Sequence, residues 1–190
     1  MCIRDRPTDL AKTQSSGCEI KLVDVDDNEV ADGEPGECAI RGPTVFSGYW
    51  NAEQTNAKDF RGGWFHMGDV FRRREDGKLV FMDRSKYMIK SGGENIYPAE
   101  IEKVLLADES VDDAVLVRRR DDRWGEVPVA VVAGKQAQLR EENLLQACKK
   151  QLAGYKVPKQ IRFVDFDDLP RSTTGKIKRH EVEKWFETTD

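Results

Sequence analysis

Two lysines of this 190-residue chain stand in polar segments with glycines, where side chains suited to a phosphate group gather. In the first segment three cations, Arg84, Lys86 and Lys90, precede the glycine pair Gly92 and Gly93. Cations can hold a nucleotide phosphate and stabilise negative charge that develops in a transition state. Glycines let the backbone approach a ligand closely. The segment therefore predicts a nucleotide-binding hairpin, and the alternative is a basic surface hairpin without a ligand.

The second lysine, Lys176, lies in Leu169–Arg179, a run that superficially resembles a phosphate-binding P-loop. A P-loop needs the pattern GxxxxGK followed by Ser or Thr, between a strand and a helix. Its first glycine is missing here and Ile177 replaces the hydroxyl residue, so we exclude a P-loop. A mobile polar loop that presents one lysine remains, and a surface loop without a ligand is the alternative.

A candidate carboxylate, that of Asp69, ends the segment Gly63–Asp69. An aspartate that follows a glycine at a strand edge can present its carboxylate to a pair of vicinal hydroxyls. Taken alone, the same dipeptide is typical of an ordinary turn. Its meaning therefore depends on the other two segments.

Metal sites and disulfides are poorly supported by the sequence. The cysteines form no CxxC pair and only two histidines could assist them; these residues are Cys2, Cys18, Cys38, Cys148, His66 and His180. We expect no metal site and no disulfide framework. Free thiols are the default in a reducing compartment, so the expected location is the cytoplasm.

The charge pattern argues against a nucleic-acid partner. The chain carries 31 basic and 35 acidic side chains with a net charge of −4, and the two signs are interspersed. A polyanion selects a one-sided basic field instead. The runs Arg72–Arg74 and Arg118–Arg120 are interpreted as solvated strand ends or loops. No apolar run is long enough to span a membrane, and the first residues contain no signal-peptide core.

The first part of the chain reads as mostly β-structure. Glu75–Gly77 is expected to be a hairpin turn in which Gly77 takes a positive φ. Asn51 is expected to cap a short helix over 51–59. Alternation of apolar and polar residues predicts strands at 18–25, 37–42, 66–74 and 78–83.

The second part predicts a compact α+β domain. Pro98 suits the first turn of a helix, and Gly154 is expected to end another helix that begins near residue 141. The expected order is a small hairpin within 83–93, the Pro98 helix, strands at 111–118 and 127–133, a helix at 141–153, a strand at 160–166 and a last helix at 178–187. We place the domain boundary between residues 83 and 84, giving domains 1–83 and 84–190.

In their order and spacing, the three segments resemble the adenylate-forming enzymes. Gly63–Asp69 is similar to the family's Gly-Trp-(Phe/Leu)-x-Thr-Gly-Asp pattern, and 83–102 to its linker and hairpin motif. Leu169–Arg179 is similar to its Pro-Arg-(Thr/Ser)-x-(Thr/Ser)-Gly-Lys loop. The family includes acyl-CoA synthetases, aryl-CoA ligases, beetle luciferases and adenylation domains of peptide synthetases. The resemblance implies the β-rich end of a large AMP-binding N-terminal domain, followed by a small mobile C-terminal lid domain.

The resemblance also implies roles for single residues. Asp69 and Arg84 match the positions that contact the ribose of ATP and AMP. Lys86 matches the hinge about which the C-terminal domain pivots. Lys90 matches the lysine of the second half-reaction or a nucleotide contact.

Three further positions carry implied roles in the same way. Gly92 and Gly93 match the backbone that lines the tunnel for the pantetheine arm of CoA, and Asn95 a polar position near the acyl-adenylate. Lys176 matches the nucleotide-binding lysine of the first half-reaction, in which a carboxylate attacks the α-phosphate and pyrophosphate leaves. In the second half-reaction a thiol displaces AMP, so rotation about Lys86 would exchange the two surfaces.

Some features depart from the family pattern. Met67 replaces the usual Thr, which removes one hydroxyl near the nucleotide, and Met1–Arg6 fits nothing that follows, so we interpret the start as truncated or artefactual. The family's glycine-rich Ser/Thr loop, its adenine- and magnesium-binding segment and its acyl pocket have no counterpart here. Mg²⁺ would be held mainly by those segments, and we expect the chain alone to be inactive.

Two classes of function remain open at this stage. The favoured one is part of an acid–thiol ligase that uses ATP, CoA and a carboxylic acid, fatty or aryl, as in fatty acid metabolism. The alternative is a non-catalytic module that binds a nucleotide or a partner. The joint presence of Asp69, Arg84, Lys90 and Lys176 favours the ligase, because a binding module would not require both lysines.

Overall fold

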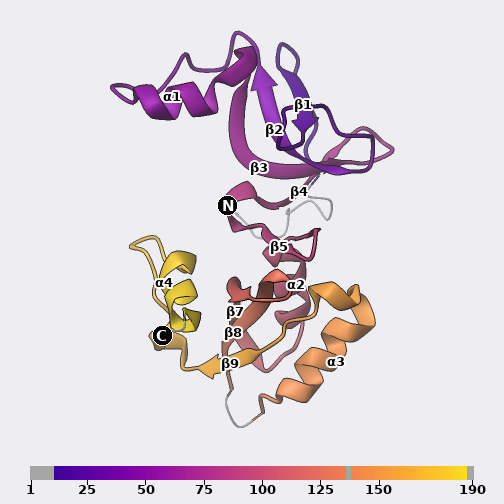
Figure 1. Ribbon diagram of the computed structural model, residues 1–190, viewed down its shortest axis with the longest axis vertical. Coiled ribbons are helices and arrows are strands. Elements are labelled where there is room, and N and C mark those ends of the chain that lie inside the picture. Colours follow the sequence, from indigo (N-terminus) through magenta and orange to yellow (C-terminus); the bar gives the residue numbers. More distant parts are fainter. Residues whose placement is uncertain (1–10, 136–137, 188–190) are drawn as a thin grey trace, which may run out of the picture. The chain divides into compact units, whose positions relative to one another are not determined.

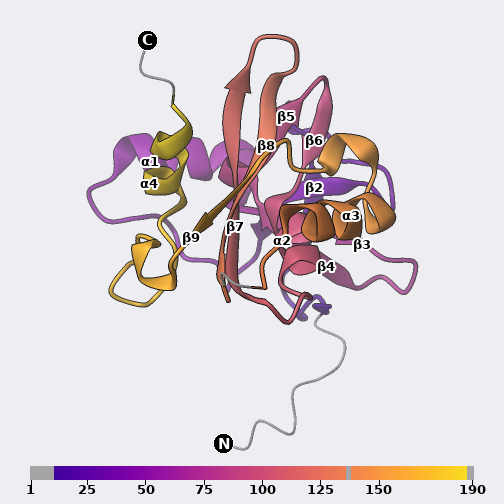
Figure 2. The ribbon, with the colours of Figure 1, turned by 90° about the horizontal axis from the view of Figure 1, so that it is seen from below.

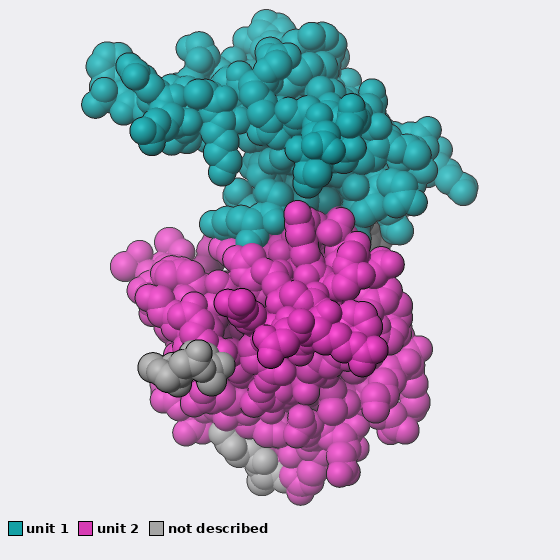
Figure 3. Space-filling view, in the orientation of Figure 1, with its two compact units in different colours: residues 1–86 teal, residues 87–190 magenta. Residues whose placement is uncertain are grey.

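The computed structural model describes residues 11–135 and 138–187. The chain divides into two compact units, residues 1–86 and residues 87–190 (Figure 3). The sequence placed the domain boundary three residues earlier than this division, between residues 83 and 84. The interpretation of Met1–Arg6 falls outside the described residues.

Unit 1, residues 1–86, is built on a four-stranded sheet whose strand order follows the chain (Figure 1). All neighbouring strands are antiparallel. The sheet therefore arises from successive local pairings, in agreement with the alternating sequence pattern. Its elements are β1 (Glu19–Val23), β2 (Pro35–Arg41), helix α1 (Glu53–Asp59), β3 (Phe65–Arg73) and β4 (Leu79–Arg84).

The β3–β4 hairpin confirms the predicted turn. Gly77 has a φ of 78°, which side chains of L-residues rarely adopt, and its N–H donates to the carbonyl of Arg74 at 2.9 Å. Phe71 and Phe81 face each other across the hairpin with ring centroids 5.5 Å apart. The paired rings and the turn fix the register of the two strands that carry the candidate site.

The predicted cap of α1 is wrong. The helix begins at Glu53 and its N-cap is Ala52, which makes no side-chain cap hydrogen bond. Asn51 instead takes a φ of 51° in the preceding turn, a conformation that Asn tolerates better than most residues. The turn is fastened to the helix by Asn56, whose side chain bonds both the N–H and the carbonyl of Tyr49, at 2.7 and 2.8 Å.

Unit 2, residues 87–190, is an α+β domain with a five-stranded sheet. Strand β8 lies at its centre, antiparallel to β7 along one edge. Its other edge pairs with β5 near Gly125 and, in parallel, with β9 from Ala130 onward. The elements are β5 (Ile89–Ser91), β6 (Glu94–Ile96), α2 (Pro98–Leu105), β7 (Val111–Asp121), β8 (Gly125–Gly134), α3 (Glu141–Gln151), β9 (Ile161–Val164) and α4 (Arg179–Glu183).

Both faces of this sheet are covered, which explains the valine-rich strands. Leu116 and Val132 belong to the cluster beneath α2 and α3, whereas their neighbours Val117 and Val131 belong to the cluster that includes Val182 of α4. Figure 2 shows α2 and α3 on one side of β7 and β8, and α4 on the other. Successive side chains of a strand point to opposite faces, so a strand buried on both faces is apolar throughout.

Element order in unit 2 is as predicted, but several boundaries differ. Helix α3 ends at Gln151 because Leu152 takes an extended backbone and packs against the core, so Gly154 does not end the helix and opens a short 3-10 turn instead. Strands β7 and β8 extend beyond the predicted ranges 111–118 and 127–133, and their pairing continues until Asp121 lies opposite Gly125. None of the helices in the described ranges is long and apolar enough to cross a membrane.

Candidate functional site

Asp69 and Arg84 are brought together by the β3–β4 hairpin. The two residues are direct cross-strand partners, and Arg84 Nε lies 2.7 Å from Asp69 Oδ1. The Asp69 side chain is 20% exposed and that of Arg84 is 51% exposed. Gly68 and Asp69 lie inside β3, as the predicted strand over 66–74 requires, so the alternative of an ordinary turn does not apply.

The backbone before Asp69 has an unusual conformation. Gly68 has a φ of 69° within the strand, and the β3–β4 register shifts immediately afterwards, between Val70 and Phe71. The Gly68 N–H donates to Glu37 Oε1 at 3.1 Å, and its carbonyl accepts from Ser85 Oγ at 3.3 Å. These bonds hold the bend that aims Asp69, and a side chain at position 68 would be strained.

The carboxylate that binds Gly68 belongs to a cluster of Asp27, Glu37, Arg61 and His66. Arg61 grips Asp27 with two nitrogens at 2.8 Å, and its Nη2 lies 3.4 Å from Glu37 Oε2. The buried His66 places Nδ1 3.6 Å from the same Glu37 oxygen. Hydrogen bonds from Arg61 lower the pKa of Asp27. Arg61 therefore fixes the position of the Glu37 carboxylate that binds Gly68. The sequence did not indicate this role of Glu37, because its partners lie 24 to 31 residues away.

One oxygen of the Asp69 carboxylate is buried beside Arg84. This oxygen is Oδ1, and no donor in the described part of the chain is aligned for a hydrogen bond to it, although Arg84 Nε is close. Buried carboxylate oxygens normally accept hydrogen bonds. In the described structure this oxygen is enclosed and lies 2.7 Å from Arg84 Nε, and a contact with a ribose hydroxyl stays a prediction for the Asp69 carboxylate.

Four of the predicted positions share the β5–β6 hairpin of unit 2. Lys90 lies opposite Asn95, and Gly92 and Gly93 form the turn with φ values of 59° and 90°. The Lys90 side chain is exposed, while its backbone N–H donates to Glu126 Oε2 at 2.9 Å. The hairpin therefore presents one cation next to two glycines, as the sequence predicted.

The two glycines of this turn differ in their surroundings. The Gly92 N–H donates to the carbonyl of Trp124 at 2.9 Å, and a Cβ added at Gly92 would lie 2.6 Å from the Trp124 ring. Nothing lies within 4 Å of a Cβ added at Gly93. Trp124 thus requires a glycine at position 92, whereas position 93 requires one only for its backbone conformation.

Lys176 stands on a hairpin of its own. Arg171 and Ile177 form an isolated β-bridge, and the Ser172 N–H donates to the Lys176 carbonyl at 2.8 Å. Ser172 Oγ also accepts the Lys176 N–H at 3.2 Å. The Lys176 side chain is exposed on the returning arm of the hairpin, opposite Ser172. The predicted polar loop is therefore a closed turn with internal hydrogen bonds.

Lys86 is the last residue of unit 1 and lies in the 3-10 turn Ser85–Tyr87. The chain passes from one unit to the other directly after it. This is the place that the sequence assigned to a hinge. Rotation about it stays a prediction.

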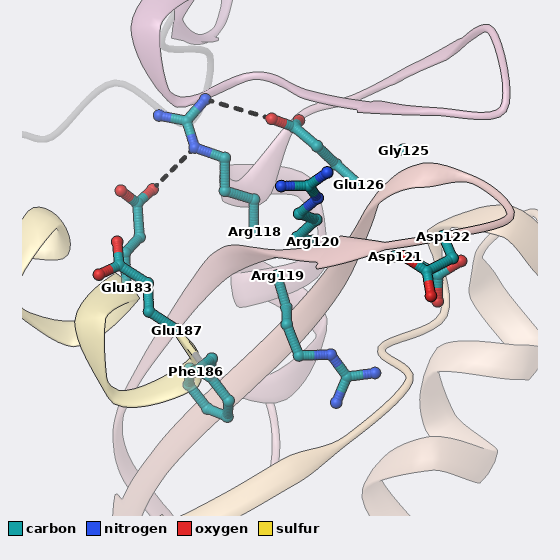
Figure 4. A pocket seen from close by; sticks show the side chains of 10 residues that line it. All are labelled: Arg118, Arg119, Arg120, Asp121, Asp122, Gly125, Glu126, Glu183, Phe186 and Glu187. Carbon is teal, nitrogen blue, oxygen red and sulfur yellow. Dashed lines mark ion pairs between the residues drawn. The ribbon is translucent and has the colours of Figure 1, made fainter. Parts of the chain in front are cut away.

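A charged hollow on unit 2 contains none of the predicted site residues. In Figure 4, Arg118 reaches Glu126 on one side and Glu183 on the other, at 3.7 and 3.2 Å. Acidic and basic side chains line it together: Arg118, Arg119, Arg120, Asp121, Asp122, Glu126, Glu183 and Glu187. Because basic and acidic side chains alternate around it, the hollow favours neither anionic nor cationic ligands. We therefore do not regard it as the candidate functional site. Within residues 11–135 and 138–187 no group of His, Cys, Asp and Glu is arranged to hold a metal ion.

Two family models match the chain. The model of the AMP-binding enzyme family matches residues 4–50, and that of the AMP-binding enzyme C-terminal domain matches residues 100–176, which form much of unit 2. The chain belongs to the AMP-binding family of adenylate-forming enzymes. Unit 2 accordingly carries the fold of the C-terminal domain of this family.

Relatives of this AMP-binding chain are CoA ligases. The chain is 47% identical over 152 residues to a 2-succinylbenzoate–CoA ligase of Geobacillus sp. strain WCH70, covering 80% of the chain and 30% of the relative. It is 43% identical over 164 residues to a long-chain-fatty-acid–CoA ligase of Escherichia coli O157:H7, covering 86% of the chain and 29% of the relative. The chain thus spans about a third of the length of the curated relatives that it matches.

A solved structure agrees with these sequence relatives. The o-succinylbenzoate CoA synthetase of Bacillus subtilis, in complex with its acyl-adenylate intermediate, superimposes with a TM-score of 0.81 and 35% identity. The match covers 92% of this chain and 34% of that one. The AMP-binding family therefore accounts for both units of the chain.

Proposed function

We propose that the chain is part of an acid–thiol ligase that activates a carboxylic acid as acyl-AMP and transfers the acyl group to CoA. One observation carries the proposal: unit 2 presents two exposed lysines, Lys90 and Lys176, on two separate hairpins. In the described residues neither ammonium has a carboxylate within ion-pair distance. Two cations kept apart in this way suit two successive reactions of one nucleotide.

The first half-reaction is assigned to Lys176 and Asp69. The acid carboxylate attacks the α-phosphorus of ATP, the bond to the β-phosphate oxygen breaks, and pyrophosphate leaves with the electron pair. Negative charge builds up on the α-phosphate, and an ammonium placed there contributes about 3 kcal/mol of transition-state stabilisation in comparable cases. Asp69 would accept from the ribose hydroxyls, while Arg84 would contact the ribose from the neighbouring strand.

The second half-reaction is assigned to the β5–β6 hairpin. The CoA sulfur attacks the acyl carbonyl, the bond to the phosphate oxygen of AMP breaks, and AMP leaves. Gly92 and Gly93 would line the passage for the pantetheine arm. The space beside Gly93 is open for a thin chain, whereas the space beside Gly92 holds the Trp124 ring. Lys90 would face the nucleotide at this stage, and Asn95 would lie near the acyl-adenylate. Rotation about Lys86 would exchange the two hairpins.

The partners follow from the same assignment. The acid is a fatty or aryl acid, in keeping with the relatives that carry those names. Mg²⁺ belongs mainly to segments of the longer ligase that this chain does not contain. We place the protein in the cytoplasm, where ATP and CoA are available. If the acid is a fatty acid, the protein acts in fatty acid metabolism.

A chimera tests the proposal directly. Residues 17–190 replace the matching C-terminal third of the Geobacillus 2-succinylbenzoate–CoA ligase, and release of pyrophosphate, AMP and acyl-CoA is measured with ATP, CoA and 2-succinylbenzoate. We expect all three products, and none from the 190-residue chain alone. A folded chimera that releases neither pyrophosphate nor acyl-CoA would contradict the ligase, and a chimera that only binds nucleotide would support a binding module.

A further inference from the structure

Arg179, the first residue of α4, lies three residues after Lys176, and both terminal nitrogens of its guanidinium group make hydrogen bonds. Its Nη1 and Nη2 contact the two carboxylate oxygens of Glu102 on α2 at 2.5 and 2.8 Å. Nη1 also donates to the Leu116 carbonyl of β7 at 2.7 Å. A bidentate guanidinium–carboxylate pair fixes orientation as well as distance.

Glu102 closes this set of contacts from the other side. Its Oε1 accepts the Leu116 N–H at 2.6 Å. The backbone of Leu116 is therefore bonded twice, its N–H by Glu102 and its carbonyl by Arg179. The side chains of Arg179 and Glu102 are only 17% and 12% exposed, so water competes little for these bonds. Three elements, α2, β7 and α4, therefore meet at one guanidinium.

Arg179 also contacts the residue that follows the proposed hinge. The guanidinium carbon lies 5.0 Å from the centre of the Tyr87 ring, within the range of a cation–π contact. Tyr87 is the first residue of unit 2 and comes directly after Lys86. The start of unit 2 and the Lys176 hairpin are thus joined through one side chain, although they lie about 90 residues apart in sequence.

The other end of the hairpin is anchored in a similar way. Arg171 Nη2 contacts Asp113 Oδ2 of β7 at 2.6 Å, and its Nη1 donates to the Gly175 carbonyl at 3.1 Å. Asp113 and Leu116 lie on the same strand, so both ends of the hairpin are attached to β7. The hairpin's internal bonds close its turn, and these arginines hold the closed turn against α2 and β7, so loss of an anchor should loosen the turn and expose its internally bonded amides to exchange.

We propose that Arg179, with Glu102, is a positioning residue for Lys176: it holds the lysine hairpin in one place on α2 and β7 and ties it to Tyr87, so that the hairpin and the start of unit 2 move as one body. The catalytic consequence rests on the proposed function, but the placement of the hairpin does not. Arg179 itself contacts no substrate in this account.

Hydrogen exchange on the full 190-residue chain tests the placement without any activity. In Arg179→Lys and in Glu102→Gln, the amides of Gly175, Lys176 and Lys178 should exchange about ten-fold faster than in the unsubstituted chain, while those of β8 stay unchanged. Lys149→Gln, an exposed charge removal on α3, is the matched control and should change neither set. Unchanged exchange at the hairpin in both variants would overturn the proposal.

The chimera tests the catalytic consequence. Arg179→Lys should lower acyl-AMP formation at least about ten-fold, since a bidentate charged contact is lost, and leave thioester formation from supplied acyl-AMP within about two-fold. Equal loss of both half-reactions, in parallel with a loss of thermal stability, would mean a purely structural role and would overturn the proposal. An inactive unsubstituted chimera would count against the proposed function instead, and hydrogen exchange would still decide the placement.

Discussion

Asp69 and Arg84 are cross-strand partners on β3 and β4, with 2.7 Å between Asp69 Oδ1 and Arg84 Nε. Since the Arg84 side chain is half exposed, the ion pair itself adds at most about 1 kcal/mol to stability. The arrangement matters more for how it orients the Asp69 carboxylate: Oδ1 is enclosed beside Arg84 without an aligned donor in the described residues, and the side chain as a whole stays 20% exposed. Gly68 and Glu37 hold that oxygen in place from the backbone side.

The first prediction concerns the Asp69 carboxylate. In the chimera, Asp69→Asn should raise the KM for ATP by about ten-fold, because a charged acceptor for ribose hydroxyls becomes a neutral one. The melting temperature should stay nearly unchanged, because the ion pair is exposed on one side. Asp76→Asn is the matched control, since Asp76 is also paired with an arginine, Arg74, at 2.9 Å. Equal effects of the two substitutions on KM would remove Asp69 from the nucleotide site.

The second prediction separates the two glycines of the β5–β6 turn. Gly92→Ala should destabilise the 190-residue chain more than Gly93→Ala, because its Cβ would lie 2.6 Å from the Trp124 ring. Positive φ alone costs an L-residue about 1–2 kcal/mol, which both variants should lose, and the contact with Trp124 adds to it only at position 92. Urea denaturation measures both. Equal losses would mean that Trp124 moves aside freely.

The third prediction concerns the acid side of the pH profile. Hydrogen bonds from Arg61 lower the pKa of Asp27 in the folded chain, so the contribution of Asp27 to stability is fully present above its unfolded pKa of about 3.9. It is lost as the pH falls through the folded pKa, because the carboxylate then protonates and the pair breaks. The difference in melting temperature between the unsubstituted chain and Asp27→Asn should therefore be constant at pH 6 to 7 and shrink below about pH 4. A difference that does not change with pH would contradict the pairing.

The fourth prediction concerns thiol reactivity. Burial raises the pKa of the Cys38 thiol to about 11, so this thiol stays protonated at pH 8. Cys148 is also buried, and burial raises its pKa too. Iodoacetamide at pH 8 followed by peptide mapping should label Cys18 well before Cys38 and Cys148. Rapid labelling of Cys38 in the folded chain would show that the β1–β2 core opens readily.

Local signals in the sequence predicted most elements but only part of the site. Gly77 and Pro98 act within a few residues of themselves, so the β3–β4 hairpin and the start of α2 were predictable. Asn51 was misassigned because its short polar side chain suits both a cap and a left-handed turn, and the hydrogen bonds of Asn56 to the Tyr49 backbone favour the turn. A longer-range contact, Arg179 with Glu102, leaves no local signal.

The motif residues themselves could be assigned only by resemblance. Composition alone did not distinguish Lys176 from any other lysine in an exposed loop. Nor did the sequence indicate that Ser172 closes this loop by bonding the Lys176 backbone. Likewise, the orientation of Asp69 depends on Glu37, which accepts the N–H of Gly68 although the two residues lie 31 positions apart in sequence. Tertiary contacts of this kind depend on how the strands pair, which no single segment specifies.

The central claim is that the two lysines serve different half-reactions from separate hairpins. Single-turnover kinetics of the chimera, with Lys176→Ala and Lys90→Ala compared side by side, test it most directly. We predict that Lys176→Ala lowers acyl-AMP formation about 100-fold and spares thioester formation from supplied acyl-AMP, since only the first step loses its cation. We predict the opposite pattern for Lys90→Ala. Loss of both half-reactions to the same degree in each variant would contradict the account.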